Sequence, residues 1–167
     1  VRMNDGEKHA VPKIALRLAL ARIGSARAEA CARKPVHVLN ETHDLRSEDA
    51  FGSWAHSLPV YIVGNLLGFN DAALPKIDAW MAAFVASLSP LSTGEQITHG
   101  AEAAQALLES FAALAMKEGA GRGSLLGMVQ QEARAVGWHN SPAVLANCIG
   151  LLSQTYDATA GLIGNSI

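Results

Sequence analysis

The side chains whose types and spacing could do chemistry are concentrated near the carboxyl end of the chain. Within residues 147–165, small and polar residues recur every three or four positions, which places them on one face of a helix. The members of this stripe are Asn147, Gly150, Gln154, Asp157, Ala158, Gly161 and Asn165. Asp157 is ionisable, and Thr159 follows two residues later. A carboxyl group and an alcohol can relay protons in general acid–base chemistry.

The stripe runs along a segment that is otherwise apolar, LLSQTYDATAGLIGNSI at 151–167. A helix that is apolar on most sides belongs in a core, where Asp157 costs free energy unless water, a partner or a ligand satisfies it. Gly161 and Gly164 lower the helix propensity further. We therefore expect something to lie against the stripe. The alternative is an aspartate on a helix face that meets solvent.

Three segments together resemble the cytochrome P-450 family. Aligned on the LIGN run at 162–165, residues 154–159 (QTYDAT) stand where the central helix of that family has Ala/Gly, Gly, any residue, Asp/Glu, Thr, Thr. Residues 4–9 (NDGEKH) resemble its D-P/G-x-x-H segment, and residues 58–69 (LPVYIVGNLLGF) resemble its Pro-Val-x-x-Ile-x-x-Leu-Leu-Gly helix. The order and spacing of the three segments agree with this one family, and the resemblance spans nearly the whole chain.

The resemblance implies catalytic positions on the stripe. Asp157 and Thr159 would be the acid and the second threonine of the family pattern. Ala158 stands where the family has the threonine used in oxygen activation. Because Ala158 has no hydroxyl group, a substrate hydroxyl or an ordered water would have to take its place.

The resemblance also implies binding positions. His9 and Lys13 would hold the propionates of a haem by charge-assisted hydrogen bonds, although a solvated terminus is the alternative for both. Gln154 replaces a small residue close to the porphyrin, where it could hydrogen-bond substrate or bound oxygen. Gly150 and Ser153, one turn earlier, would face the substrate pocket.

The chain lacks two elements of that family, the Glu-x-x-Arg helix and the loop that carries the haem-ligating cysteine. Cys31 is followed by Ala-Arg-Lys and Cys148 by Ile-Gly-Leu, so neither lies in such a loop. Since a cysteine thiolate promotes cleavage of the O–O bond, we expect no monooxygenase activity from this chain alone.

We therefore expect residues 1–167 to be a single partial P-450 domain, truncated at both ends. The parent enzyme would oxidise a small organic substrate with O₂ and electrons from a ferredoxin- or flavodoxin-type redox partner. The alternative is a haem-free, truncated helical bundle that acts as an interaction module and forms homo-oligomers through its exposed apolar face.

The elements that must position these residues are helices. Hydrophobic spacing, capping residues, prolines and glycines predict no strand. The predicted helices cover residues 12–33, 47–57, 59–68, 70–89, 93–117, 124–136 and 142–167, with a linker at 34–46 and a flexible loop at 119–123. The predicted N-caps are Ser47, Asn70 or Asp71, Thr93, Ser124 and Ser141. We expect an all-α protein, a helical bundle corresponding to part of the P-450 fold.

Composition and the distribution of polar residues exclude several classes of function. Half of the 167 residues are hydrophobic, and the net charge of −2 indicates no nucleic-acid partner. Polar residues interrupt every long apolar run, so we expect no membrane span. Two distant cysteines suit reduced thiols in the cytoplasm. Glu95, His99 and Glu102 share a helix face, but without a second ligand-bearing helix we expect them to be solvated and predict no metal site.

Overall fold

The computed structural model describes the backbone of residues 7–117 and 123–166, and side chains from residue 10 onward within those ranges. Over this part of the chain it contains seven helices and no strand. The helices are α1 (Glu7–Ala21), α2 (Ser25–Thr42), α3 (Glu48–Leu67), α4 (Leu74–Ala86), α5 (Gly94–Met116), α6 (Leu125–Ala135) and α7 (Ser141–Gly164). The predicted all-α class is confirmed.

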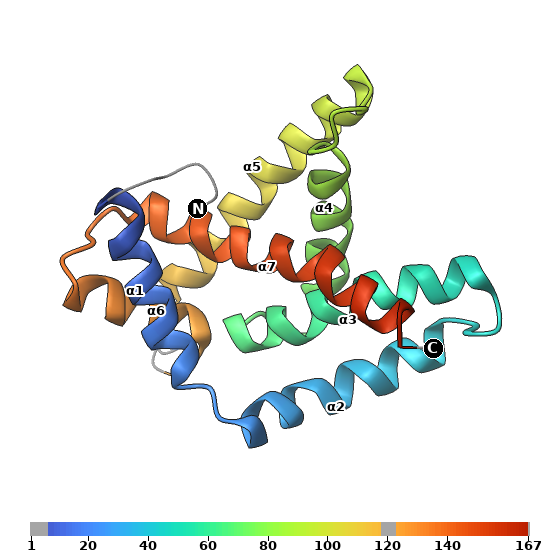
Figure 1. Cartoon of the computed structure of the whole chain (residues 1–167), viewed down its shortest axis with the longest axis horizontal. Coiled ribbons are helices and arrows are strands. Elements are labelled where there is room, and N and C mark those ends of the chain that lie inside the picture. Colours follow the sequence, from blue (N-terminus) through green and yellow to red (C-terminus); the bar gives the residue numbers. More distant parts are fainter. Residues whose placement is uncertain (1–6, 118–122, 167) are drawn as a thin grey trace.

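Helix α7 crosses the middle of the molecule and packs along α3, which runs in the opposite direction (Figure 1). Helices α4 and α5 pair as a hairpin, α2 packs on α3, and α1 packs on α6. Gly100 lets α5 pass close to the end of α4, because a Cβ there would lie 2.2 Å from the Cβ of Ser87. The helices form one hydrophobic core, to which α1 contributes Ala15 and Ala19, and Pro12 of α1 is also buried.

The core is built from aliphatic side chains with few aromatic ones. Its largest fully buried side chains come from five helices and include Leu67, Met81, Leu107, Leu126 and Leu152. Phe111 is also fully buried and meets Phe69 edge-on, with ring centroids 5.0 Å apart. Burial of this apolar surface, at about 25 cal/mol per Å², is the main term that stabilises the fold.

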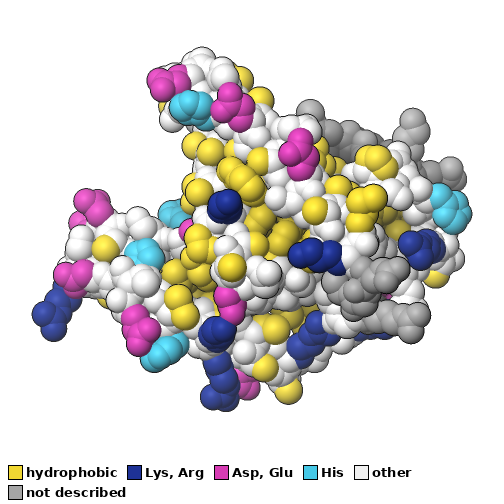
Figure 2. Space-filling model, turned by 180° about the vertical axis from the view of Figure 1, so that it is seen from behind, with side chains coloured by type: hydrophobic (Ala, Val, Ile, Leu, Met, Phe, Trp, Pro, Cys, Tyr) yellow, Lys and Arg dark blue, Asp and Glu magenta, His cyan; other side chains and the backbone are white. Residues whose placement is uncertain are grey.

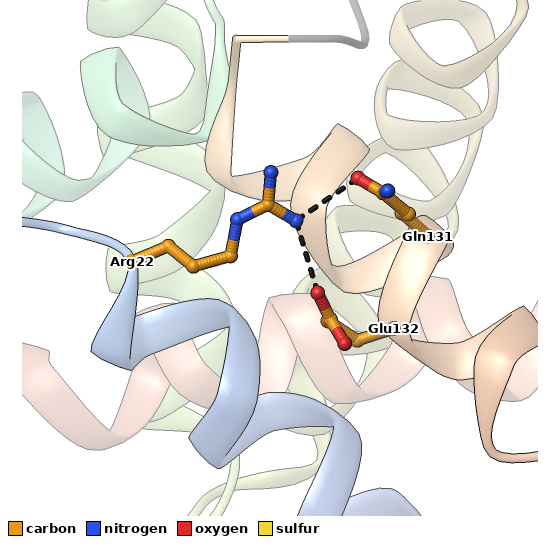
Figure 3. Close-up of polar contacts among 3 residues, drawn as sticks. All are labelled: Arg22, Gln131 and Glu132. Atoms are coloured by element: carbon orange, nitrogen blue, oxygen red, sulfur yellow. Dashed lines mark hydrogen bonds and ion pairs between the residues drawn. The ribbon is translucent and has the colours of Figure 1, made fainter.

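A polar contact ties α1 to α6 at the surface. One guanidinium nitrogen of Arg22, just after α1, donates to Oε1 of Gln131 and to Oε1 of Glu132, each at 2.9 Å (Figure 3). The arginine is partly exposed, so the ion pair with Glu132 stabilises the fold only modestly. It fixes how the end of α1 meets α6.

The predicted helix at 12–33 and linker at 34–46 are wrong. The chain instead breaks at residues 22–24, and α2 continues to Thr42. Proline usually ends a helix because it lacks an N–H group and clashes with the preceding turn. In α2, however, Pro35 is buried together with Leu39. Packing on α3 offsets the lost hydrogen bond, and that packing is not visible in the local sequence.

The predicted break between residues 57 and 59 is also wrong, again because a proline inside the helix is buried. Helix α3 runs without interruption from Glu48 to Leu67, with Pro59 inside it. Leu58, Pro59 and Val60 are all buried. An interior proline costs a helix about 3 kcal/mol, and tertiary burial of this apolar run compensates for that cost.

The helix caps follow local rules. Ser47, Thr93 and Ser124 cap their helices as predicted, and Thr93 also forms a capping box with Gln96. The predicted cap at Asn70 or Asp71 is wrong, because α4 begins at Leu74 and Asn70 accepts from the Ala73 amide in the turn before it. Helix α7 differs by one residue, because the side chain of Asn140, not that of Ser141, caps it. Gly68 ends α3 with φ 110°, a left-handed conformation that favours glycine.

Among the described residues, no helix combines the length and the apolar character needed to cross a membrane.

Candidate functional site

The two sides of α7 have different surroundings. The stripe lies on the outer side from Gln154 to Asn165, where its residues are exposed, whereas Asn147 and Gly150 are half-buried. The opposite side is buried against the core through Val144, Cys148, Ile149, Leu152 and Ala160. A Cβ added at Gly150, Gly161 or Gly164 would meet no atom within 4 Å. The described residues therefore leave open space along the stripe.

The carboxyl group of Asp157 lies at the solvent edge of this stripe. Its side chain is 70% exposed, and its Oδ1 lies 3.8 Å from Nε2 of His56 on α3. Water and this imidazole remove most of the cost that a buried aspartate would carry. Asp157 therefore needs no further ligand to be stable in this fold.

Thr159 does not form a pair with Asp157. Residues two apart on a helix point in different directions, and Thr159 is half-buried while Asp157 and Ala158 are exposed. None of the hydrogen bonds described for these residues joins the carboxyl group to the hydroxyl. An acid–alcohol relay within this pair would need a bridging water.

The predicted substrate-binding residues share the open side of α7 only in part. The hydroxyl of Ser153 donates to the Gly150 carbonyl oxygen at 3.0 Å, so its hydrogen is engaged within its own helix. Gln154 is exposed, and no hydrogen bond is described for its side-chain amide. Of the three, Gln154 has its polar group available for a ligand.

The predicted haem-propionate residues lie on α1. Lys13 is exposed, and α1 packs on α6 without any described hydrogen bond or ion pair to α7. His9 belongs to the helical backbone of α1, but its side chain lies outside the described residues. The structure thus leaves Lys13 free to bind an anion and does not join it to Asp157.

Two other groups of residues bear on metal or haem binding. Glu95, His99 and Glu102 are exposed on α5, and within the described residues no three His, Cys, Asp or Glu side chains are grouped to hold a metal ion. Cys148 is fully buried, and burial raises the pKa of its thiol to about 12. It is a neutral core thiol at physiological pH and does not supply a thiolate ligand.

A polar cluster that sequence analysis missed lies where α3, α4 and α7 meet. We call it the Asp78 cluster; it comprises His43, His56, Ser57, Tyr61, Asp78 and Tyr156. Its centre is Asp78 on α4, which accepts a hydrogen bond from the Ser57 hydroxyl at 2.6 Å. Burial raises the pKa of Asp78, while this hydrogen bond and the charges of His43 and His56 act in the opposite direction.

Two tyrosines enclose the cluster. Burial raises the pKa of Tyr61 and of Tyr156, and the negative charge of Asp78 raises both further. The Tyr156 ring packs against the His56 ring with centroids 4.9 Å apart. Because His56 also faces Asp157, the cluster reaches the edge of the stripe.

No spacing in the sequence could have identified the Asp78 cluster, because its members come from four separate segments of the chain. The one local signal is the adjacent pair of His56 and Ser57, polar residues that immediately precede the buried run beginning at Leu58. Polar residues at the border of a buried run are common, so this signal alone predicts no site.

Comparison of the chain with models of protein families, with curated proteins and with solved structures gave no match.

Proposed function

We propose that this chain is part of a haem-dependent monooxygenase of the cytochrome P-450 type, in which the open stripe of α7 faces the haem and the substrate. One observation carries the proposal. The stripe combines glycines and polar side chains on the exposed side of a long central helix, with open space at Gly150 and Gly161. Such glycines weaken the helix by about 1 kcal/mol each, and no described packing requires them.

The residues present fit one face of a haem. A flat porphyrin can approach a helix closely only where side chains are small, as they are at Ala158 and Gly161. Gln154 is larger, but it is exposed and can turn aside. The exposed ammonium group of Lys13 can bind a carboxylate. Cys148 does not fit the role of axial ligand, because it is a buried, neutral thiol.

When bound, the haem would supply the activation of O₂ for insertion into a substrate C–H bond. The chain's own residues would hold and orient the reactants. Asp157 would hold a proton at Oδ1 at the edge of the stripe, and Gln154 and Gly150 would border the substrate. The proposal includes a small organic substrate, a ferredoxin- or flavodoxin-type electron donor and a cytoplasmic location, which suits two free cysteines.

Haem titration tests this proposal. We expect haem added to the chain to give a saturable Soret band at one haem per chain. Gly161→Leu would fill the open space on the stripe and weaken binding by about tenfold or more. Ala113→Leu, at an exposed position on α5, is the matched control and should bind as the original chain does.

Two results would contradict the proposal. One is the absence of saturable haem binding, and the other is equal affinity in the Gly161→Leu variant and the original chain. A haem-thiolate spectrum would instead contradict the expected lack of an axial cysteine, and with it the expected inactivity of the chain alone.

A second candidate function is association of haem-free copies. Several large apolar side chains are exposed, among them Leu162 at 69%. Figure 2 shows apolar side chains gathered over the middle of the face that lies behind the view of Figure 1, with charged groups around and between them. Contiguous apolar surface promotes association, and Leu162 lies beside the stripe on α7.

Sedimentation velocity over a range of concentrations tests the second candidate. It predicts a concentration-dependent dimer or larger oligomer that Leu162→Glu dissociates. Leu91→Glu, in the turn between α4 and α5, is the control that should not change the assembly. A monomer at all concentrations would rule this candidate out.

A further inference from the structure

A small pocket lies between the end of α6 and the beginning of α7, which the turn at residues 136–140 connects (Figure 1). Its volume is about 90 Å³, enough for a small oxyanion. Ala133 and Val144 are buried and form its apolar part. Neither the stripe nor the Asp78 cluster contributes a residue to this pocket.

The rest of the pocket is lined by side chains that can donate hydrogen bonds. They are Gln130, Arg134, Trp138, His139 and Ser141. Each of them carries at least one N–H or O–H group. Within the part of the chain that the structure describes, none of the five side chains takes part in a hydrogen bond or an ion pair. Polar groups that converge on one pocket without internal partners are available to a ligand.

Arg134 gives the pocket its positive charge. Other arginines around α6 are engaged within the fold, since Arg22 pairs with Glu132 at 2.9 Å and Arg27 donates to the Gly123 carbonyl oxygen. Glu132 is the one acidic residue between positions 123 and 156. This stretch of the chain therefore supplies no further carboxylate to neutralise Arg134, and a guanidinium group in that situation suits an anionic ligand.

The number and placement of the donors favour a phosphate group over a carboxylate. A carboxylate offers two acceptor oxygens, whereas a phosphate group offers three or more. The donors reach the pocket from three segments: α6 supplies Gln130 and Arg134, the turn supplies Trp138 and His139, and α7 supplies Ser141. The positive end of the α7 dipole adds to the attraction for an anion.

We propose that this pocket binds a phosphate group. Arg134 is its bidentate partner, and Trp138 and Ser141 donate further hydrogen bonds to it. Arg134, His139 and Ser141 are exposed, so the pocket is open to solvent and accepts either a free phosphate ion or the phosphate end of a larger molecule. The proposal does not depend on haem binding, because the pocket and the stripe share no residue.

Titration with inorganic phosphate tests the proposal, followed by nuclear magnetic resonance of the isotopically labelled chain at constant ionic strength. We expect the indole N–H signal of Trp138, assigned with Trp138→Phe, to shift and to saturate. The indole signals of Trp54 and Trp80, which lie outside the pocket, should stay in place. Acetate at the same ionic strength should bind much more weakly.

A titration with phenyl phosphate separates the two sources of the phosphate group. Trp138 lines the pocket, and its indole ring can pack against an aromatic ester group. Tighter binding than that of inorganic phosphate would indicate a phosphate ester as the ligand, and weaker binding would indicate the free ion.

Arg134→Gln should weaken phosphate binding by about tenfold or more, because it removes the charge and the paired donors. Arg46→Gln changes an exposed arginine between α2 and α3 and is the matched control, which should bind phosphate as the original chain does. Ser141→Ala should weaken binding by about threefold. It leaves the helix cap intact, because Asn140 caps α7.

The proposal is overturned if phosphate gives no saturable shift at Trp138, or if acetate binds as tightly as phosphate. It is also overturned if Arg134→Gln binds phosphate as the original chain does. If Arg134→Gln fails to fold, the comparison of Ser141→Ala with the original chain decides the matter.

Discussion

The two sides of α7 differ in what the fold requires of them. On the buried side, Cys148 and Leu152 have no exposed surface and pack against the core. On the open side, Asp157 is largely exposed, and Gly161 has no atom within 4 Å of where a Cβ would lie. The buried side is therefore explained by packing. The residue types on the open side have no such explanation, which is why we propose that the functional surface lies there.

The largest expected difference between the two sides is in thiol reactivity. Only the thiolate reacts, and burial raises the pKa of Cys148 to about 12. In a Cys31→Ser background, Cys148 should react with a thiol reagent at pH 8 about a thousandfold more slowly than a cysteine introduced on the open side by Ala158→Cys. The absorbance of the coloured group that the reagent releases measures both rates. Similar rates would show that the two sides are equally accessible.

The second-largest expected difference between the two sides is in the effect of a mutation on the free energy of unfolding. Leu152→Ala removes a fully buried side chain and should cost about 2–5 kcal/mol in the free energy of unfolding. Leu162→Ala, at an exposed position on the same helix, should change it by no more than about 0.5 kcal/mol. Urea denaturation measures both. A comparable loss in the two variants would mean that the open side is covered in solution.

The Asp78 cluster should make stability depend on pH. Burial raises the pKa of Asp78, so the folded state keeps this proton to a higher pH than the unfolded chain does. The stabilisation that results is fully present below the unfolded pKa and is lost as the pH rises through the folded pKa. Ser57 opposes this shift by donating to the carboxylate at 2.6 Å. Ser57→Ala should therefore cost about 1–2 kcal/mol at pH 7.

The cost of Ser57→Ala should be smaller at pH 3, where Asp78 is protonated in both states. Ser53→Ala is the control, because that hydroxyl donates to a backbone carbonyl on the exposed side of α3. Urea denaturation at the two pH values measures the difference. An equal cost at both would mean that the hydrogen bond does not depend on the charge of Asp78.

The smallest effect should be a gain in stability on the open side. Gly161→Ala adds a methyl group in open space and should stabilise the chain by about 0.5–1 kcal/mol, because alanine favours the helix. Gly100→Ala should have the opposite effect on stability. Its added Cβ would lie 2.2 Å from the Cβ of Ser87, and this clash should destabilise the chain. Thermal denaturation measures both changes. A loss of stability in Gly161→Ala would show that a group already packs against the stripe.

The candidate site was predictable only in part. The stripe on α7, with Asp157 at its centre, follows from helical spacing and is found as one face of the helix. The prediction that something lies against it remains open, because the described residues place nothing there. His56 and Asp78 could not be predicted, since their positions beside α7 depend on how α3 and α4 pack against it.

The sequence by itself determined the helical class and most of the caps, such as Ser47, Thr93 and Ser124, because these depend on residues within one turn of each other. Only the tertiary structure decided that α2 and α3 continue through Pro35 and Pro59, because burial against neighbouring helices offsets the local cost of proline. It also decided which side of α7 is open and which side chains meet Asp157, because those contacts join segments that are distant in the chain.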